Sequence, residues 1–199
     1  MGIHRTGKFW SFEHFGLRPD IVVFGKALTN GLNPLSGIWA RDDLISPEKF
    51  PPGSTHSTFS SNTLGTAVAL EAVRMMEEEN YEELTRRKGA YFLAQLRELQ
   101  RRYPKVIGDT DGCGMALRVE ICCEDGYEPD RELTDRIFAE GMKGDLDARG
   151  RRMGLVLDVG GYYKNVFTLA PCFDMTEGEI DLAVELLEQL IHRCAAERV

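Results

Sequence analysis

The sequence predicts an α/β protein, with part of an α/β domain over residues 1–103 and a smaller α+β domain over residues 104–199. Three observations predict this. Residues 21–24, "IVVF", form a short, continuously apolar run, which is typical of a strand buried on both faces of a parallel sheet. Two segments with helical spacing follow it. After residue 104 the pattern changes to alternating, turn-punctuated strands with two further helices.

The first half begins with this strand and continues through a turn-rich segment to a second short strand candidate, "GIWA" at residues 37–40. Residues 46–62 are rich in proline, serine, threonine and glycine, which predicts a long loop. Long loops in compact domains are often functional. Asn62 has the residue type of an N-cap for a helix over residues 63–79.

The second helix is predicted over residues 81–103 and ends at Pro104. The later elements are strands over residues 105–123, a helix over residues 130–150, a strand–turn–strand over residues 154–171 and a final helix that opens with the capping box of Thr176 and Glu179.

The composition is that of an ordinary globular protein, with 43% hydrophobic and 28% charged residues in 199. The net charge of −8 argues against a nucleic-acid partner. No apolar run approaches the ~20 residues of a membrane span, so we expect no membrane association. No signal-peptide pattern is present, and the five cysteines form no CxxC pair. We therefore expect a cytoplasmic protein without a metal site.

Lys26 follows the apolar run almost directly, at the end of a predicted strand where reactive groups collect in open α/β sheets. Partial desolvation of an ammonium group favours the neutral amine, which is the nucleophile that a Schiff-base lysine requires. The alternative is a lysine that extends into water as its strand ends. Taken alone, the pattern favours this alternative.

The loop "GSTHSTFSSN" at residues 53–62 holds seven hydroxyl or amide side chains in ten positions, just before a predicted helix. Hydroxyls and the free N–H groups of a helix N-terminus can bind a phosphate. A capping loop with spare hydroxyls is an equal alternative. A nucleophilic lysine together with a phosphate-binding loop indicates pyridoxal 5′-phosphate, which needs an amine for its aldehyde and donors for its phosphate.

The sequence resembles the class III pyridoxal-phosphate aminotransferases of fold type I, which include the ornithine, acetylornithine and 4-aminobutyrate aminotransferases. Three stretches carry the resemblance: "RTGKFWSFEHFGLRPDIVVFGKALTNGLNPLSG", "STFSSNTLGTAVALEAV" and "NVFTLAP". By this resemblance, residues 1–103 would be the C-terminal part of the large cofactor-binding domain and residues 104–199 the small α+β domain. Lys26 would be the catalytic Schiff-base lysine, and Ser57 and Thr58 would help to bind the cofactor phosphate.

The same resemblance implies a reaction in which an amino group passes from an amine or amino acid to a keto acid. It also implies a homodimer in the full-length enzyme. Thr168 stands where relatives that act on ω-amino acids often carry an arginine, so either another residue binds a substrate carboxylate or the donor is a different amine. The candidates for the carboxylate are Arg118, Arg149, Arg151 and Arg152. Racemases, aminomutases and decarboxylases share the lysine and the loop, and fold-level resemblance does not exclude them.

Family members carry an Asp-Glu-Val-Gln segment just before the Arg-Thr-Gly that is residues 5–7 here, so we expect this chain to be the C-terminal portion of a longer enzyme. On its own it is expected to bind the cofactor weakly or not at all. The alternative is a non-catalytic fragment or the half of a split gene, which only packs with a partner. His4 replaces a usual glycine, and His14, His56 and His192 are interpreted as surface or packing residues.

Overall fold

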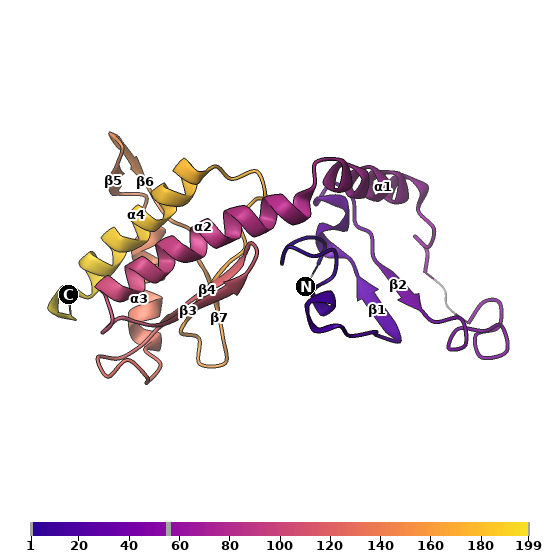
Figure 1. Ribbon diagram of the computed structural model, residues 1–199, viewed down its shortest axis with the longest axis horizontal. Helices are drawn as coiled ribbons and strands as arrows, with labels where there is room; N and C mark the ends of the chain where they lie inside the picture. Colours follow the sequence, from indigo (N-terminus) through magenta and orange to yellow (C-terminus); the bar gives the residue numbers. More distant parts are fainter. Residues whose placement is uncertain (1, 55–56, 199) are drawn as a thin grey trace. The chain divides into compact units, whose positions relative to one another are not determined.

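The computed structural model describes residues 2–54 and 57–198, and it divides into two compact units (Figure 1). Unit 1 consists of the described residues up to His4 together with Lys8–Glu82. Unit 2 consists of Arg5–Gly7 together with the described residues from Glu83 onward. The domain boundary predicted between residues 103 and 104 lies further along the chain, and that assignment stays a prediction.

Unit 1 is built around a two-stranded antiparallel sheet and one long helix. Its strands β1 and β2 pair from Ile21 opposite Ala40 to Phe24 opposite Gly37. The bounds of its elements are η1 Ser11–Phe15, β1 Ile21–Phe24, η2 Lys26–Thr29, β2 Gly37–Ala40 and α1 Thr63–Glu78. The two strands and α1 therefore lie where the sequence predicts them.

The surroundings of β1 differ from the prediction. A strand buried on both faces was expected, but Ile21 is 54% and Val23 74% exposed. The described chain supplies only β2 as a neighbour, and the pairing is antiparallel. An apolar run indicates that a strand is suited to burial, but it does not supply the segments that would cover it. The prediction of a buried parallel strand is therefore wrong for this chain.

Unit 2 contains a four-stranded antiparallel sheet in the order β3-β4-β8-β7. The helix α2, which begins in unit 1, continues through it (Figure 1). The bounds of the elements are α2 Tyr81–Arg102, β3 Ile107–Cys113, β4 Ala116–Ile121, α3 Arg131–Gly141, β5 Leu146–Ala148, β6 Arg151–Met153, β7 Asp158–Gly160, β8 Val166–Leu169, α4 Glu177–Cys194 and η3 Ala196–Arg198.

The core of unit 2 lies between this sheet and its helices. Every second residue of β4 is buried, from Leu117 to Ile121, and the residues between them are more exposed. This alternation is the pattern of a sheet packed on one face only. The helix α4 begins with the predicted capping box, in which Thr176 accepts from the Glu179 N–H and the Glu179 carboxylate accepts from the Thr176 N–H.

The helix predicted over residues 130–150 is too long. The helix α3 ends at Gly141, and the following residues form the small hairpin of β5 and β6. Arg149 and Gly150 join these strands with φ angles of 50° and 74°. Two successive residues with positive φ are typical of a tight hairpin turn whose twist matches that of its strands. The hairpin therefore interrupts the helical pattern.

A stack of close backbone contacts ties Arg5–Gly7 into unit 2. A Cβ on Gly89 of α2 would lie 2.1 Å from the carbonyl oxygen of Gly114, in the turn between β3 and β4. A Cβ on Gly114 would in turn lie 2.8 Å from the Arg5 carbonyl oxygen. The Arg5 guanidinium lies 4.1 Å from the Phe173 ring centre and donates to the Pro171 carbonyl. Two glycines thus allow three backbone segments to pack directly on one another.

Unit 2 is expected to lose stability in alkali because two buried acids resist ionisation. Burial, reinforced by a hydrogen bond to Glu188, raises the pKa of Tyr103 to about 12, and burial raises the pKa of Cys122 to about 11. The unfolded chain loses these protons at lower pH than the folded chain does, so the unfolding free energy falls between about pH 9 and pH 12. Urea unfolding followed across this range should show a smaller fall for Tyr103→Phe. An identical fall in the variant would contradict the assignment.

None of the helices in residues 2–54 and 57–198 combines the length and the apolar character that crossing a membrane requires. Within the same residues, no three histidine, cysteine, aspartate or glutamate side chains gather closely enough to hold a metal ion.

Candidate active site

Lys26 lies two residues beyond the end of β1, at the first position of η2, in a backbone conformation that is unusual for lysine. Its φ angle is 52°, in the left-handed region that favours glycine. The turn is fixed by hydrogen bonds from the Leu28 N–H to the Gly25 carbonyl and from the Asn30 N–H to the Ala27 carbonyl. Backbone strain of this kind persists where the surroundings hold it, and it is concentrated at functional sites.

The side chain of Lys26 is exposed. A nucleophilic Lys26 requires partial desolvation at the end of a buried strand, and the described chain does not supply it, because β1 itself is largely exposed. An amine in this position would become a stronger nucleophile only when further atoms cover it, whether from a ligand or from another polypeptide segment.

Ser57 and Thr58 are also in unit 1 and are exposed. They open a turn in which the Ser60 N–H donates to the Ser57 carbonyl over 3.0 Å. Their hydroxyls are donors that could hold a phosphate. Thr55 and His56 of the same loop lie outside the described residues.

A pair of asparagines joins the segment after Lys26 to the segment after Thr58. The Asn62 side-chain amide donates to the Asn33 side-chain oxygen over 3.3 Å. Thr29, which is only 1% exposed, donates to the Asn33 carbonyl and so closes the turn that begins at Lys26. The two predicted site segments are therefore linked by a hydrogen bond that the sequence analysis did not anticipate.

Asn62 also changes the expected role of the helix terminus. Its side-chain oxygen accepts from the N–H groups of Leu64 and Gly65 over 3.1 and 3.3 Å. The N–H groups at the start of α1 were predicted to be available to a phosphate, but the N-cap already satisfies these two. A phosphate in this region would therefore depend more on the loop hydroxyls, among them those of Ser57 and Thr58, than on these two N–H groups.

The strand register separates the arginines that the sequence could not rank. Arg118 on β4 lies directly opposite Thr168 on β8, and directly opposite residues of an antiparallel pair share a sheet face. The Arg118 guanidinium lies 2.6 Å from an Asp109 carboxylate oxygen. The other candidates, Arg149, Arg151 and Arg152, belong to the β5–β6 hairpin and its turn.

The histidines have mainly structural surroundings. His4 is 4% exposed and has a φ angle of 59°. Glycine adopts a positive φ without a steric cost, so a glycine suits this position. Burial lowers the pKa of His4, and neither of its ring nitrogens has a hydrogen-bond partner among the described residues. His192 lies 2.6 Å from the Tyr103 hydroxyl, and His14 is exposed. His56 lies outside the described residues.

Three comparisons place this chain among known proteins. An alanine/serine racemase from Pyrococcus horikoshii is 32% identical over 190 residues, which cover 96% of this chain and 37% of the racemase. An ornithine aminotransferase from Bordetella pertussis is 31% identical over 194 residues, covering 98% of this chain and 42% of that enzyme. The crystal structure of a transaminase from the marine bacterium Virgibacillus superposes with a TM-score of 0.86 at 24% identity, covering 98% of this chain and 44% of that one.

The chain spans about two fifths of the length of the curated relatives it matches. The structural likeness agrees with the predicted fold class, part of an α/β fold type I transferase. Residues 1–191 match the family of class-III aminotransferases, whose members in general depend on pyridoxal phosphate. The chain therefore belongs to the class-III aminotransferase family.

Proposed function

We propose that this chain carries part of the active site of an aminotransferase that uses pyridoxal 5′-phosphate, with Lys26 as the Schiff-base lysine. The observation that carries the proposal is the placement of Lys26 in a family member: it follows β1 in a strained turn, and Asn33 and Asn62 link that turn to the loop of Ser57 and Thr58. The substrates would be a small amino donor and a keto acid.

The chemical groups of Lys26, Ser57 and Thr58 are those that this cofactor requires. A primary amine can hold an aldehyde carbon covalently, and two exposed hydroxyls can donate to a phosphate. The cofactor, when bound, supplies an aldehyde for amines and a conjugated ring that stabilises negative charge on the adjoining carbon. Lys26 would hold the aldehyde carbon, and its freed amine would later move a proton at the reacting carbon of the substrate. Ser57 and Thr58 would orient the phosphate.

Racemisation is a second candidate, because the alanine/serine racemase is among the similar relatives. Both reactions need the same lysine, so the residues described here do not separate them. They differ in their need for an acceptor: transamination consumes a keto acid, whereas racemisation proceeds without one.

The test is to supply the protein with pyridoxal phosphate and L-alanine, with and without 2-oxoglutarate, and to measure glutamate and D-alanine. Because this chain spans only about two fifths of its relatives, glutamate formation that depends on 2-oxoglutarate is expected when the remaining segments of the enzyme are supplied with it, and little or none from the chain alone. D-alanine formation that is unaffected by 2-oxoglutarate, with no glutamate, would replace transamination by racemisation. If neither product forms with any amine donor tried, even with the remaining segments of the enzyme present, the proposal fails.

We also propose that residues 1–103 belong to the large cofactor-binding domain and residues 104–199 to the small domain. Unit 2 contains its own four-stranded antiparallel sheet and the long helix α4, which supports a separate small domain. A homodimer of the full-length enzyme and a cytoplasmic location belong to the same proposal, and they rest on the family alone.

A further inference from the structure

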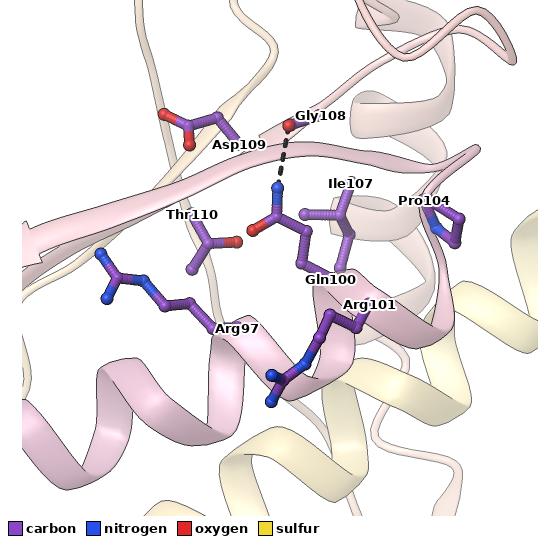
Figure 2. A pocket seen from close by; sticks show the side chains of 8 residues that line it. All are labelled: Arg97, Gln100, Arg101, Pro104, Ile107, Gly108, Asp109 and Thr110. Atoms are coloured by element: carbon purple, nitrogen blue, oxygen red, sulfur yellow. Dashed lines mark hydrogen bonds between the residues drawn. The ribbon is translucent and has the colours of Figure 1, made fainter.

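Unit 2 contains a cavity of about 560 Å³ between the C-terminal half of α2 and strand β3 (Figure 2). This volume lies within the range of ~300–1,000 Å³ that is usual for small-molecule sites. Eight residues line the cavity, and none of them is a residue of the candidate active site: Arg97, Gln100, Arg101, Pro104, Ile107, Gly108, Asp109 and Thr110.

The cavity presents two guanidinium groups. Arg97 and Arg101 are four residues apart on α2, so their side chains leave the same face of the helix. Both are exposed and have only surface partners: Arg97 lies 3.8 Å from an Asp111 oxygen, and Arg101 lies 2.5 Å from a Glu98 oxygen. Exposed ion pairs of this kind are weak, so an incoming anion can compete with them.

The one acidic residue of the lining does not oppose an anion. Asp109 is held at 2.6 Å by Arg118, and Figure 2 shows its carboxylate directed away from Arg97 and Arg101. The other lining groups give the cavity an apolar wall from Ile107 and Pro104. A ligand with one negatively charged end and an apolar body matches this distribution.

A buried hydroxyl at the cavity points to a ligand independently. Thr110 is 3% exposed, and its hydroxyl has no hydrogen-bond partner among the described residues. Figure 2 shows this hydroxyl turned toward Gln100, whose amide nitrogen is already fixed by donating to the Gly108 carbonyl over 2.9 Å. A buried hydroxyl without a partner is destabilising, and a ligand atom that accepts its hydrogen bond would remove this cost.

We propose that this cavity binds a small organic anion. Its phosphate or carboxylate group would be held by Arg97 and Arg101, the Thr110 hydroxyl would donate a hydrogen bond to it, and its apolar body would pack on Ile107 and Pro104. Guanidinium groups recognise both oxyanions through paired N–H donors, so the two ligand classes share this chemistry.

Calorimetric titration of the whole chain at low salt tests the proposal with inorganic phosphate and succinate as probes. At least one probe should bind, and the preferred one identifies the phosphate or the carboxylate class. The double variant Arg97→Gln with Arg101→Gln should weaken binding at least ~tenfold. Arg131→Gln, a single arginine of α3 away from the cavity, should leave binding unchanged.

Thr110→Val separates a ligand contact from a packing defect. The two side chains are nearly equal in shape, so the variant should keep or raise the unfolding temperature while it weakens binding of the preferred probe about threefold or more. Absence of binding by both probes would overturn the proposal. So would equal binding by the wild type and the double arginine variant, or unchanged binding by Thr110→Val.

Discussion

Replacing Lys26 with alanine is expected to remove the specific adduct between this protein and pyridoxal phosphate. In the wild type, treatment with the cofactor followed by borohydride should attach it mainly to Lys26, because the hydrogen bond between Asn33 and Asn62 links the turn of this lysine to the loop whose hydroxyls would hold the phosphate. Reduction traps even a weak complex, so the measurement does not need a stable holoprotein. Peptide mapping by mass spectrometry locates the label.

Two variants serve as controls for this experiment. Lys49→Ala removes another exposed lysine of unit 1 and should leave the adduct unchanged. Lys26→Arg keeps the positive charge but cannot capture the aldehyde in the same way, so it should lose the adduct as Lys26→Ala does. A label spread over the lysines according to their exposure, with no preference for Lys26, would refute the proposed role. Such a result would leave the family membership and the anion cavity untouched.

Replacing Gly89 with alanine is expected to destabilise unit 2 by roughly 3 kcal/mol, at the upper end of the cost of overpacking. The new methyl carbon would lie 2.1 Å from the Gly114 carbonyl oxygen, which is far inside normal contact. The obstacle is backbone and not a flexible side chain, so α2 or the β3–β4 turn must move. Unfolding in urea, followed by circular dichroism, measures the effect.

Gly178→Ala provides a matched control with the opposite sign. Gly178 lies in the first turn of α4, and the nearest atom to an added Cβ is 3.8 Å away, an ordinary contact. Alanine has the higher helix propensity, so this variant should gain up to ~1 kcal/mol of stability. If both variants were equally stable, the close approach of α2 and Gly114 would not constrain the fold.

Local sequence signals predicted the helices well. Asn62 and Thr176 start α1 and α4 as expected, because a capping side chain acts within three residues of its own position. The end of α3 at Gly141 and the turn at Arg149–Gly150 were not predicted. The turn forms only because β5 and β6 pair with each other, and this pairing leaves no signal in the local sequence. The apolar run of β1 was recognised as a strand, but its neighbours come from elsewhere in space and left no local signal.

The candidate site was predictable only in part. The type and the strand-end position of Lys26 can be read from the sequence, but its positive φ cannot. Asn33 was missed because an asparagine in a turn has many ordinary roles, and its partner Asn62 lies 29 residues away. The roles of Ser57 and Thr58 stay predictions. Arg118 became distinct from the other arginines only when the strand register placed it opposite Thr168.

The position of Arg5–Gly7 has a mechanical consequence. This tripeptide belongs to unit 2, while the described residues on either side of it belong to unit 1. The polypeptide therefore crosses between the units three times, twice around the tripeptide and once within α2. A substitution that removes the contact between the Arg5 guanidinium and the Phe173 ring is therefore expected to loosen the packing of unit 2, although the neighbours of the tripeptide along the chain belong to unit 1.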